Sequence, residues 1–217
     1  MIFVNFKLYG QSFGEGAIRL AEICKRVGEK YKISIYPVVQ ALDAVRIMKE
    51  VGIPVVLQNC DEWWEGARTG WTSAEAAKEL GIWGSLINHS EHKTKPGSIK
   101  KMLKHWPEGF KSIVCIHSWG QAERWAKNIK PDLVAYEPTY LIGSKDKSVS
   151  TEKPDMIKKL AEHYQPIPLL AGAGVHNTED VRVAKTLGAK GILVASDVVK
   201  ADNPEKELAE LAGGFSV

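Results

Sequence analysis

The sequence predicts a closed (β/α)8 barrel, in which eight parallel strands form an inner ring and the intervening helices surround it. Eight short runs rich in Val, Ile and Leu recur along the chain, and they are nearly continuous in hydrophobicity instead of alternating with polar residues. Such runs are typical of strands that are buried on both faces of a parallel sheet. Amphipathic segments with helical spacing lie between them, and 217 residues shared by eight units leave about 27 residues for each strand and helix.

The strands follow one another with no break in composition and no linker, so we expect one domain over residues 1–217. An open doubly wound sheet would also alternate strands and helices, but it rarely repeats the unit eight times so regularly. In chain order the predicted strands are 2–6 (IFVNF), 33–38 (ISIYPV), 55–59 (VVLQN), 85–89 (SLINH), 112–117 (SIVCIH), 133–137 (LVAYE), 168–173 (PLLAGA) and 191–196 (GILVAS).

Several segments between the strands combine helical spacing with recognisable ends. Ser73 lies where a helix N-cap is needed, and Thr178 precedes two acidic residues in the same way. Gly52, Gly81 and Gly188 fall where helices should stop, because glycine readily adopts the left-handed conformation found there. The segments are 17–30, 41–52, 73–81, 178–188 and 204–211.

The composition is that of an ordinary folded protein, with 44% hydrophobic and 25% charged residues. The net charge of +3 permits small anionic ligands, and no block of like charges suggests a nucleic-acid partner. The opening MIFVNFK lacks the features of a secretory signal, and no apolar run approaches the roughly 20 residues that span a membrane. Cys24, Cys60 and Cys115 form no CxxC pair, which fits reduced thiols in a cytoplasmic protein better than a disulfide or zinc framework.

Polar and small residues stand at the carboxyl ends of five predicted strands. In this fold those ends form the rim that carries the active site, so these residues are candidates for catalysis and binding. The small residues after the last two strands would leave backbone N–H groups open to a phosphate, although a tight turn alone would also explain the glycines. A dinucleotide site is disfavoured, because GAGVHN lacks the third glycine or alanine of that motif. The strand ends are Asn5-Phe6-Lys7, Asn88-His89, Glu137, Gly172-Ala173-Gly174 and Ala195-Ser196.

A long connection, residues 138–150 (PTYLIGSKDKSVS), follows the sixth strand. Its apolar middle, Leu141-Ile142-Gly143, would be exposed to water in a simple linker. A loop of this length in so small a barrel is usually functional, so we expect a lid that closes over a ligand.

Taken together, the strand-end motifs resemble the triosephosphate isomerase family, in particular its short archaeal branch. The motifs are NFK, NHSEH, YEP followed by LIG, GAG, and LVAS followed by DVVKA, and they occur in the family's order over essentially the whole chain. The resemblance implies a TIM barrel of glycolysis and gluconeogenesis. Its activity would be the interconversion of dihydroxyacetone phosphate and D-glyceraldehyde 3-phosphate through an enediolate, without a metal or cofactor.

The resemblance also implies roles for individual residues. Glu137 would be the base that moves a proton between two carbons, and His89 would be the neutral electrophile. This family is itself a standard example of how a protein tunes the pKa values of such groups. We expect residues 90–96 (SEHKTKP) to begin a helix whose positive end keeps this histidine neutral. Lys7 would supply fixed positive charge to the substrate, and Glu91 would be either its partner or a helix-start residue and not a proton carrier.

Substrate binding would fall to the first strand end and to the loops that follow the sixth, seventh and eighth strands. The lid departs from the family pattern, because Ser144-Lys145-Asp146-Lys147 replaces an expected second glycine and adds a residue. Its amino-terminal hinge, Pro138-Thr139-Tyr140, is also unusual for the family. The binding residues implied are Asn5, Phe6, Lys7, Ile142 and the backbone amides around Gly143, Gly174, Ala195 and Ser196.

Other residues near the rim have simpler explanations. We do not expect His89, Glu91 and His92 to form a metal site, because the spacing is not H-E-x-x-H and no third ligand is evident. His117 ends the fifth strand but matches no catalytic residue of the family, so we expect it to cap a backbone group or to support the site. Cys60 and Cys115 are expected in the core as small apolar residues.

The segment 61–70 (DEWWEGARTG) carries Trp63 and Trp64 after the third strand. These tryptophans could fold back over their own barrel. In the family, however, this loop inserts into a neighbouring subunit, with a threonine that corresponds to Thr69, and exposed paired tryptophans are typical interface anchors. We therefore expect a homodimer or homotetramer, and the archaeal resemblance favours the tetramer.

Two other functions remain open from the sequence. One is a barrel of the same kind that acts on a longer sugar phosphate. The other is a phosphate-ligand sensor without turnover, which the presence of Lys7, His89 and Glu137 argues against, because a binding protein does not need a base.

Overall fold

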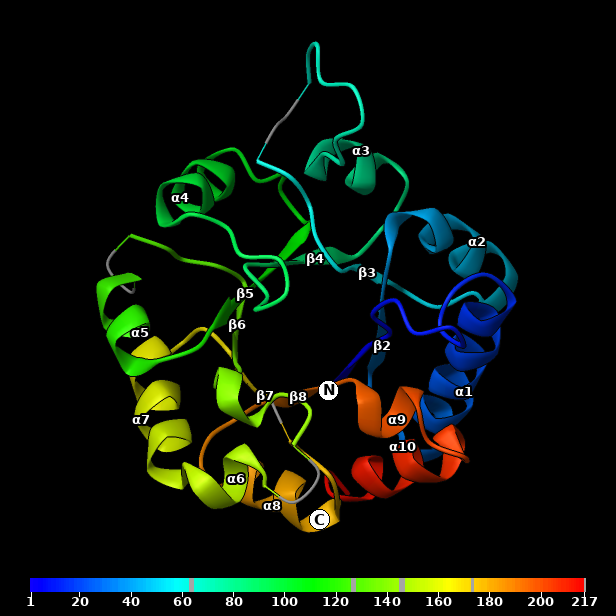
Figure 1. Cartoon of the computed structure of the whole chain (residues 1–217), viewed down its shortest axis with the longest axis vertical. Coiled ribbons are helices and arrows are strands. Elements are labelled where there is room, and N and C mark those ends of the chain that lie inside the picture. Colours follow the sequence, from blue (N-terminus) through cyan, green and yellow to red (C-terminus); the bar gives the residue numbers. More distant parts are fainter. Residues whose placement is uncertain (63–64, 126–127, 145–146, 173, 217) are drawn as a thin grey trace.

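Eight parallel strands close into a barrel in chain order, with β8 hydrogen-bonded to β1. The structure is a computed structural model, and it describes residues 1–62, 65–125, 128–144, 147–172 and 174–216. Figure 1 looks down the ring of strands, with the helices around its outside. Because the sheet closes, the (β/α)8 prediction is confirmed and the open doubly wound sheet is wrong. The strands are β1 (Ile2–Asn5), β2 (Ile35–Val39), β3 (Val56–Leu57), β4 (Gly84–Ile87), β5 (Lys111–Ile116), β6 (Leu133–Tyr136), β7 (Leu169–Gly172) and β8 (Gly191–Val194).

Both faces of the strands are buried, which accounts for the continuous apolar runs. Phe3, Val38 and Leu86 belong to one apolar cluster, and Ile2 and Val4 belong to another. Since neighbouring side chains of a strand point to opposite faces, the first cluster fills the barrel and the second packs between strands and helices. The strands pair in parallel, for example with Asn5 beside Val38, so their carboxyl ends meet at one rim.

The five helices predicted above are all present, with ends that differ by two residues or fewer. No helix in the described part of the chain is both long and apolar enough to span a membrane. The helices are α1 (Glu15–Tyr31), α2 (Ala41–Val51), α3 (Ala74–Glu79), α4 (Pro96–Lys104), α5 (Trp119–Trp125), the 3-10 turn η1 (Thr139–Leu141), α6 (Val149–Glu152), α7 (Pro154–Tyr164), α8 (Thr178–Thr186), α9 (Ser196–Val199) and α10 (Pro204–Gly213).

The helix caps agree with the sequence at α3 and differ at α8. The Ser73 side chain accepts a hydrogen bond from the backbone N–H of Ala76, as predicted. At α8 the cap is Asn177, whose side chain accepts from the N–H of Asp180. Thr178 is already helical, and its hydroxyl donates to the carbonyl oxygen of Glu210. The prediction that Thr178 caps this helix is therefore wrong by one residue.

Candidate active site

A pocket opens at the rim, where the carboxyl ends of β1, β6, β7 and β8 meet the lid. It brings together most of the residues predicted as site residues, and a neighbouring hollow holds His89 beside Asn5 and Lys7. Phe6 lies elsewhere, because its side chain is fully buried in the apolar core behind β1. The predicted residues that line the pocket are Asn5, Lys7, Glu137, Ile142, Gly143, Gly174, Ala195 and Ser196.

Glu137 follows β6, and its carboxyl group is enclosed by the barrel. Its backbone N–H donates to the carbonyl oxygen of Ile116, which continues the sheet hydrogen bonding by one residue. The side-chain atom Oε2 is buried, without a hydrogen-bond partner among the described residues, and lies 3.5 Å from Nε2 of His89. Burial raises the pKa of the adjacent Cys115 thiol well above its usual value, and the Glu137 carboxylate raises it further. A buried, unpaired carboxylate oxygen is costly, and it is free to interact with a ligand.

Gly172 gives the Glu137 side chain the space it occupies. A Cβ atom at residue 172 would lie 2.8 Å from Cγ of Glu137 and 3.3 Å from the carbonyl oxygen of Leu193. Contacts below 3.0 Å require a neighbour to move, so a larger residue would displace the carboxylate. From the sequence, phosphate binding or a tight turn was expected of this glycine, and its role in making room for Glu137 was not predicted.

The hydrogen bonds of His89 define which ring nitrogen carries the proton. Its Nδ1 accepts a hydrogen bond from the backbone N–H of Glu91 at 3.2 Å. A nitrogen that accepts has a free lone pair, so in this arrangement the imidazole is neutral and its proton is on Nε2, facing Glu137. The helix expected over residues 90–96 is absent, because these residues form turns and α4 begins only at Pro96. A single backbone N–H, and not a helix end, therefore favours the neutral ring.

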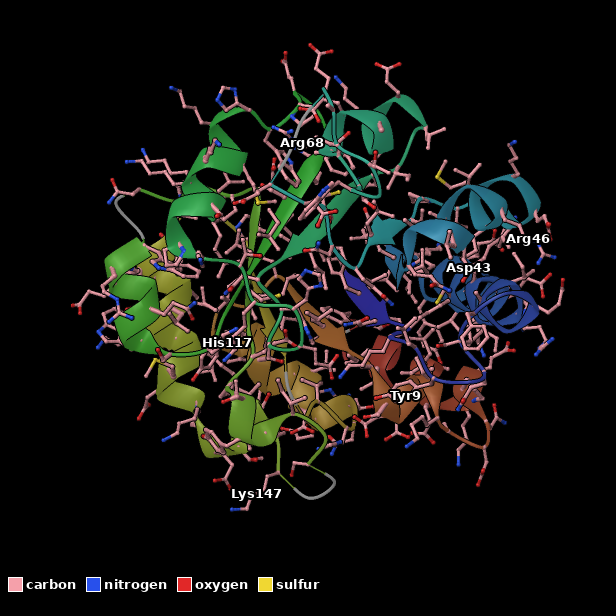
Figure 2. All side chains as sticks on the ribbon, turned by 45° about the horizontal axis from the view of Figure 1, so that its top comes forward. Tyr9, Asp43, Arg46, Arg68, His117 and Lys147 are labelled. Carbon is pink, nitrogen blue, oxygen red and sulfur yellow. The ribbon has the colours of Figure 1, made fainter. Side chains whose placement is uncertain are left out.

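His117 links the ends of three neighbouring strands. Its ring nitrogens lie 3.0 Å from the carbonyl oxygen of Glu137 and 3.2 Å from that of Asn88, and Figure 2 shows it beside the barrel mouth. The Asn88 side chain donates to the carbonyl oxygen of Cys115 and accepts from the N–H of Thr94. The expectation that His117 caps backbone groups is thereby confirmed. The partners could not be predicted, because they depend on strand register.

Lys7 is held in position by contacts at both its backbone and its side chain. Its φ of 52° lies in the left-handed region, which is uncommon for a residue with a side chain. The side chain of Asn5 accepts a hydrogen bond from the Lys7 N–H, and the Gln58 amide donates to the Lys7 carbonyl oxygen. The Lys7 ammonium lies 2.7 Å from Oε1 of Glu91, so the predicted partner is confirmed. The sequence analysis did not identify Gln58.

The lid begins with the turn η1, which anchors it to the barrel. Leu141 is fully buried, Ile142 is partly buried and lines the pocket, and Tyr140 is 60% exposed. The predicted extra residue of the lid falls on 144–147, of which Lys145 and Asp146 lie outside the described residues, as do Trp63, Trp64 and Ala173 of the other loops.

Five pocket residues were not among the predicted site residues, and two of them, Tyr9 and Asp197, carry polar side chains. An acidic side chain in a pocket with several backbone amides is notable, because it would repel an anion. Within the described ranges, no group of three or more His, Cys, Asp or Glu side chains is arranged to hold a metal ion.

Comparison with known proteins places this geometry in one family. A family model described as "Triosephosphate isomerase" matches residues 1–212. A triosephosphate isomerase of Methanothermus fervidus is 39% identical over 216 residues, which cover 97% of this chain and 96% of that protein. The triosephosphate isomerase of Methanocaldococcus jannaschii is 36% identical, and the match covers 97% of this chain and 98% of that protein. The one of Saccharolobus solfataricus is 37% identical, and the match covers 95% of this chain and 92% of that protein.

Proposed function

The chain belongs to the triosephosphate isomerase family, and we propose how its rim residues carry out that family's reaction, the interconversion of dihydroxyacetone phosphate and D-glyceraldehyde 3-phosphate. The observation that carries the proposal is the buried, unpaired Oε2 of Glu137, 3.5 Å from Nε2 of His89 and in the pocket that Lys7 lines. A base, a hydrogen-bond donor and a fixed cation thus lie together at the rim, in the pocket and the hollow beside it. These are the groups that proton abstraction next to a carbonyl requires.

Glu137 is the base of this proposal. Its carboxylate removes a proton from the carbon next to the substrate carbonyl, which leaves an enediolate, and then returns the proton to the neighbouring carbon. Its Oε2 has no competing hydrogen bond among the described residues, so no such contact must break before the proton moves. Gly172 leaves room for this side chain to face the substrate.

His89 donates a hydrogen bond from Nε2 to the carbonyl oxygen and to the oxygens of the enediolate. The N–H of Glu91 holds the other nitrogen as an acceptor, so the ring is oriented before the substrate binds. A neutral imidazole is a weaker acid than an imidazolium, and it can therefore stabilise the enediolate without transferring a full proton too early.

Lys7 supplies the positive charge that balances the substrate phosphate and the enediolate. Its side chain is only 14% exposed, and the pairing of its ammonium with Glu91 fixes its position. Asn5 contributes by accepting the Lys7 N–H, which stabilises the unusual backbone conformation there. Preorganised charge of this kind lowers the barrier because it needs no rearrangement during the reaction.

The phosphate group is bound by backbone amides around Gly143, Gly174, Ala195 and Ser196, with Ile142 closing over it. These residues line one pocket together with Glu137. Lid closure excludes water, which protects the enediolate phosphate from losing its phosphate group. No metal or cofactor takes part in this proposal.

The purified protein should interconvert the two triose phosphates rapidly in a coupled assay, and added chelator should not change the rate. Longer ketose phosphates should be poor substrates. Faster turnover of a longer sugar phosphate would indicate a different isomerase. Tight binding of a triose phosphate analogue without turnover would indicate a sensor.

We also propose that the protein is a homodimer or homotetramer, assembled through the segment 61–70. Figure 1 shows the connection between β3 and α3 extending beyond the ring of helices, and residues 65–70 are exposed, followed by Trp71 at 53%. The rim hollow beside Lys7 is lined in part by Leu8, which is 70% exposed, and by Ala41, whose chain neighbour Leu42 is 88% exposed. A projecting loop and an apolar hollow on the same chain favour a symmetric pairing, in which each loop enters the other subunit's hollow.

Sedimentation at micromolar concentration should give a mass at least twice the 24.0 kDa of one chain. Leu42→Arg should dissociate the assembly, because it places a charge on the exposed residue that follows Ala41 of the proposed hollow. Leu80→Arg is the matched control, since Leu80 is also exposed but follows α3, at the opposite end of the barrel from the rim. A monomeric wild type, or equal dissociation by both variants, would contradict the proposed interface.

A cytoplasmic location and a role in glycolysis and gluconeogenesis complete the proposal. Cys24, Cys60 and Cys115 are free and buried, and burial raises the pKa of Cys24 and of Cys60 to about 12. Such thiols are stable in a reducing compartment. The relatives named above come from archaea, which supports an archaeal type of enzyme.

A further inference from the structure

The pocket proposed to hold the phosphate contains a carboxylate. Asp197 follows Ser196 in α9 and lines the pocket with Gly143 and Gly174. Its side chain is 33% exposed, so it is only partly screened by water. A carboxylate this close would weaken the binding of a phosphate dianion unless another group compensates its charge.

His176 lies in the position to compensate this charge. Its Nδ1 is 3.4 Å from Oδ2 of Asp197, and its Nε2 is 3.3 Å from the carbonyl oxygen of Lys147. Both ring nitrogens therefore face oxygens that can only accept hydrogen bonds. Both contacts can be hydrogen bonds only when both nitrogens carry a proton, which is the imidazolium form.

The same histidine lies where the carboxyl end of the lid meets the loop after β7. A Cβ atom at Gly174 would be 2.2 Å from the carbonyl oxygen of Lys147, so the two segments are in direct contact. Asp180 accepts hydrogen bonds from the backbone N–H of His176 and from the hydroxyl of Ser148. Figure 2 shows Lys147 at the edge of the molecule beside the lid.

We propose that His176, as an imidazolium, is the positioning residue that neutralises Asp197 and fastens the end of the lid, and that it thereby allows the pocket to bind a dianionic phosphate group. The inference rests on the proposed function, because that function assigns the phosphate to this pocket. It assigns a role in substrate binding to a residue other than Glu137, His89 and Lys7.

The charged groups around His176 support this assignment. Asp197 of α9 and Asp180 of α8 are both acidic, and Lys147 contributes its carbonyl oxygen. The Lys147 side chain is 60% exposed, and its ammonium lies 3.8 Å from Glu152. The pKa of His176 is raised above 6.5, first by its hydrogen bond with Asp197, against the opposing effect of burial. The imidazolium is therefore the main form below the raised value. As the pH rises through that value, the positive charge and one of the two hydrogen bonds are lost.

Sulfate is a suitable probe, because it remains a dianion from about pH 6 to about pH 9, where phosphate itself titrates. Its affinity should be measured by calorimetry at several pH values in low salt. The wild type should bind sulfate about tenfold more weakly at the upper end of this range than at the lower end. His176→Asn should bind weakly throughout, with little dependence on pH.

Asp197→Asn tests the compensation directly. With the carboxylate removed, sulfate binding should depend little on His176, so the double variant His176→Asn/Asp197→Asn should regain most of the affinity lost by His176→Asn. His163→Asn is the matched control, since this histidine lies on α7 against Trp119 and outside the pocket. The sulfate affinity of His163→Asn should depend on pH as that of the wild type does. Circular dichroism should check that each variant is folded. If His176→Asn does not fold, Asp197→Asn alone tests whether the carboxylate makes sulfate binding depend on His176.

A wild-type affinity that does not change with pH would overturn the proposal, as would a double variant as weak as His176→Asn. If the wild type isomerises triose phosphates and either result is found, the proposed function stands and only the role of His176 fails. If the wild type neither turns over nor binds sulfate, the assignment of the pocket to phosphate is wrong, and the role of His176 with it.

Discussion

Glu137→Gln should lower kcat for triose phosphate isomerisation by about a thousandfold, while the affinity for a triose phosphate analogue stays within about tenfold. Glutamine has the shape of glutamate but cannot accept the substrate proton. The change leaves no cavity at this buried position. It also removes a buried carboxylate whose Oε2 has no hydrogen-bond partner among the described residues, so the thermal midpoint should be equal to that of the wild type or higher.

The matched control is Glu162→Gln, which removes the same charge from an exposed position on α7. It should leave kcat unchanged. Exchange of solvent deuterium into the substrate should be lost together with turnover in Glu137→Gln, because both need the proton to be removed. If Glu137→Gln retains a tenth or more of the wild-type kcat, the base is a different residue.

The barrel could be predicted because its signals are local. Strands buried on both faces are nearly continuous in apolar residues, and helices have caps and glycine stops within a few positions. The prediction was least accurate at β3, where the run VVLQN yields only Val56–Leu57. The side chain of Gln58 donates to the carbonyl oxygen of Lys7, which follows β1, and to that of Val38 in β2. The sequence of this segment does not contain these contacts.

The rim residues could be predicted from the family motifs, whereas their supporting contacts could not. His117 contacts backbone atoms of Asn88 and Glu137, and His176 faces Asp197 across 21 positions of sequence. Such pairs follow from strand register and loop geometry. The false helix start after His89 has the same origin: the Asn88 side chain binds the N–H of Thr94 and holds a turn over residues that have helical propensity.

His89→Gln should lower kcat by about a hundredfold, with a much smaller change in KM, because the hydrogen bond from Nε2 strengthens as charge develops on the substrate oxygen. The glutamine amide can also donate a hydrogen bond. It lacks the second nitrogen that the Glu91 N–H holds in place, so its donor is not oriented towards Glu137 and the substrate. The coupled assay, run with and without chelator, measures this loss.

His92→Gln is the control for a glutamine in the same turn, since the His92 side chain is exposed and its contact with His89 runs from its backbone N–H to the His89 carbonyl oxygen. Equal losses in both variants would mean that the turn, and not the imidazole, matters. An active His89→Gln would assign the electrophile to Lys7 alone. If kcat falls only in His89→Gln and chelator has no effect, a histidine follows β4 because a neutral donor is needed 3.5 Å from the base. That donor is Nε2, and the backbone N–H of Glu91 keeps the other ring nitrogen free of a proton.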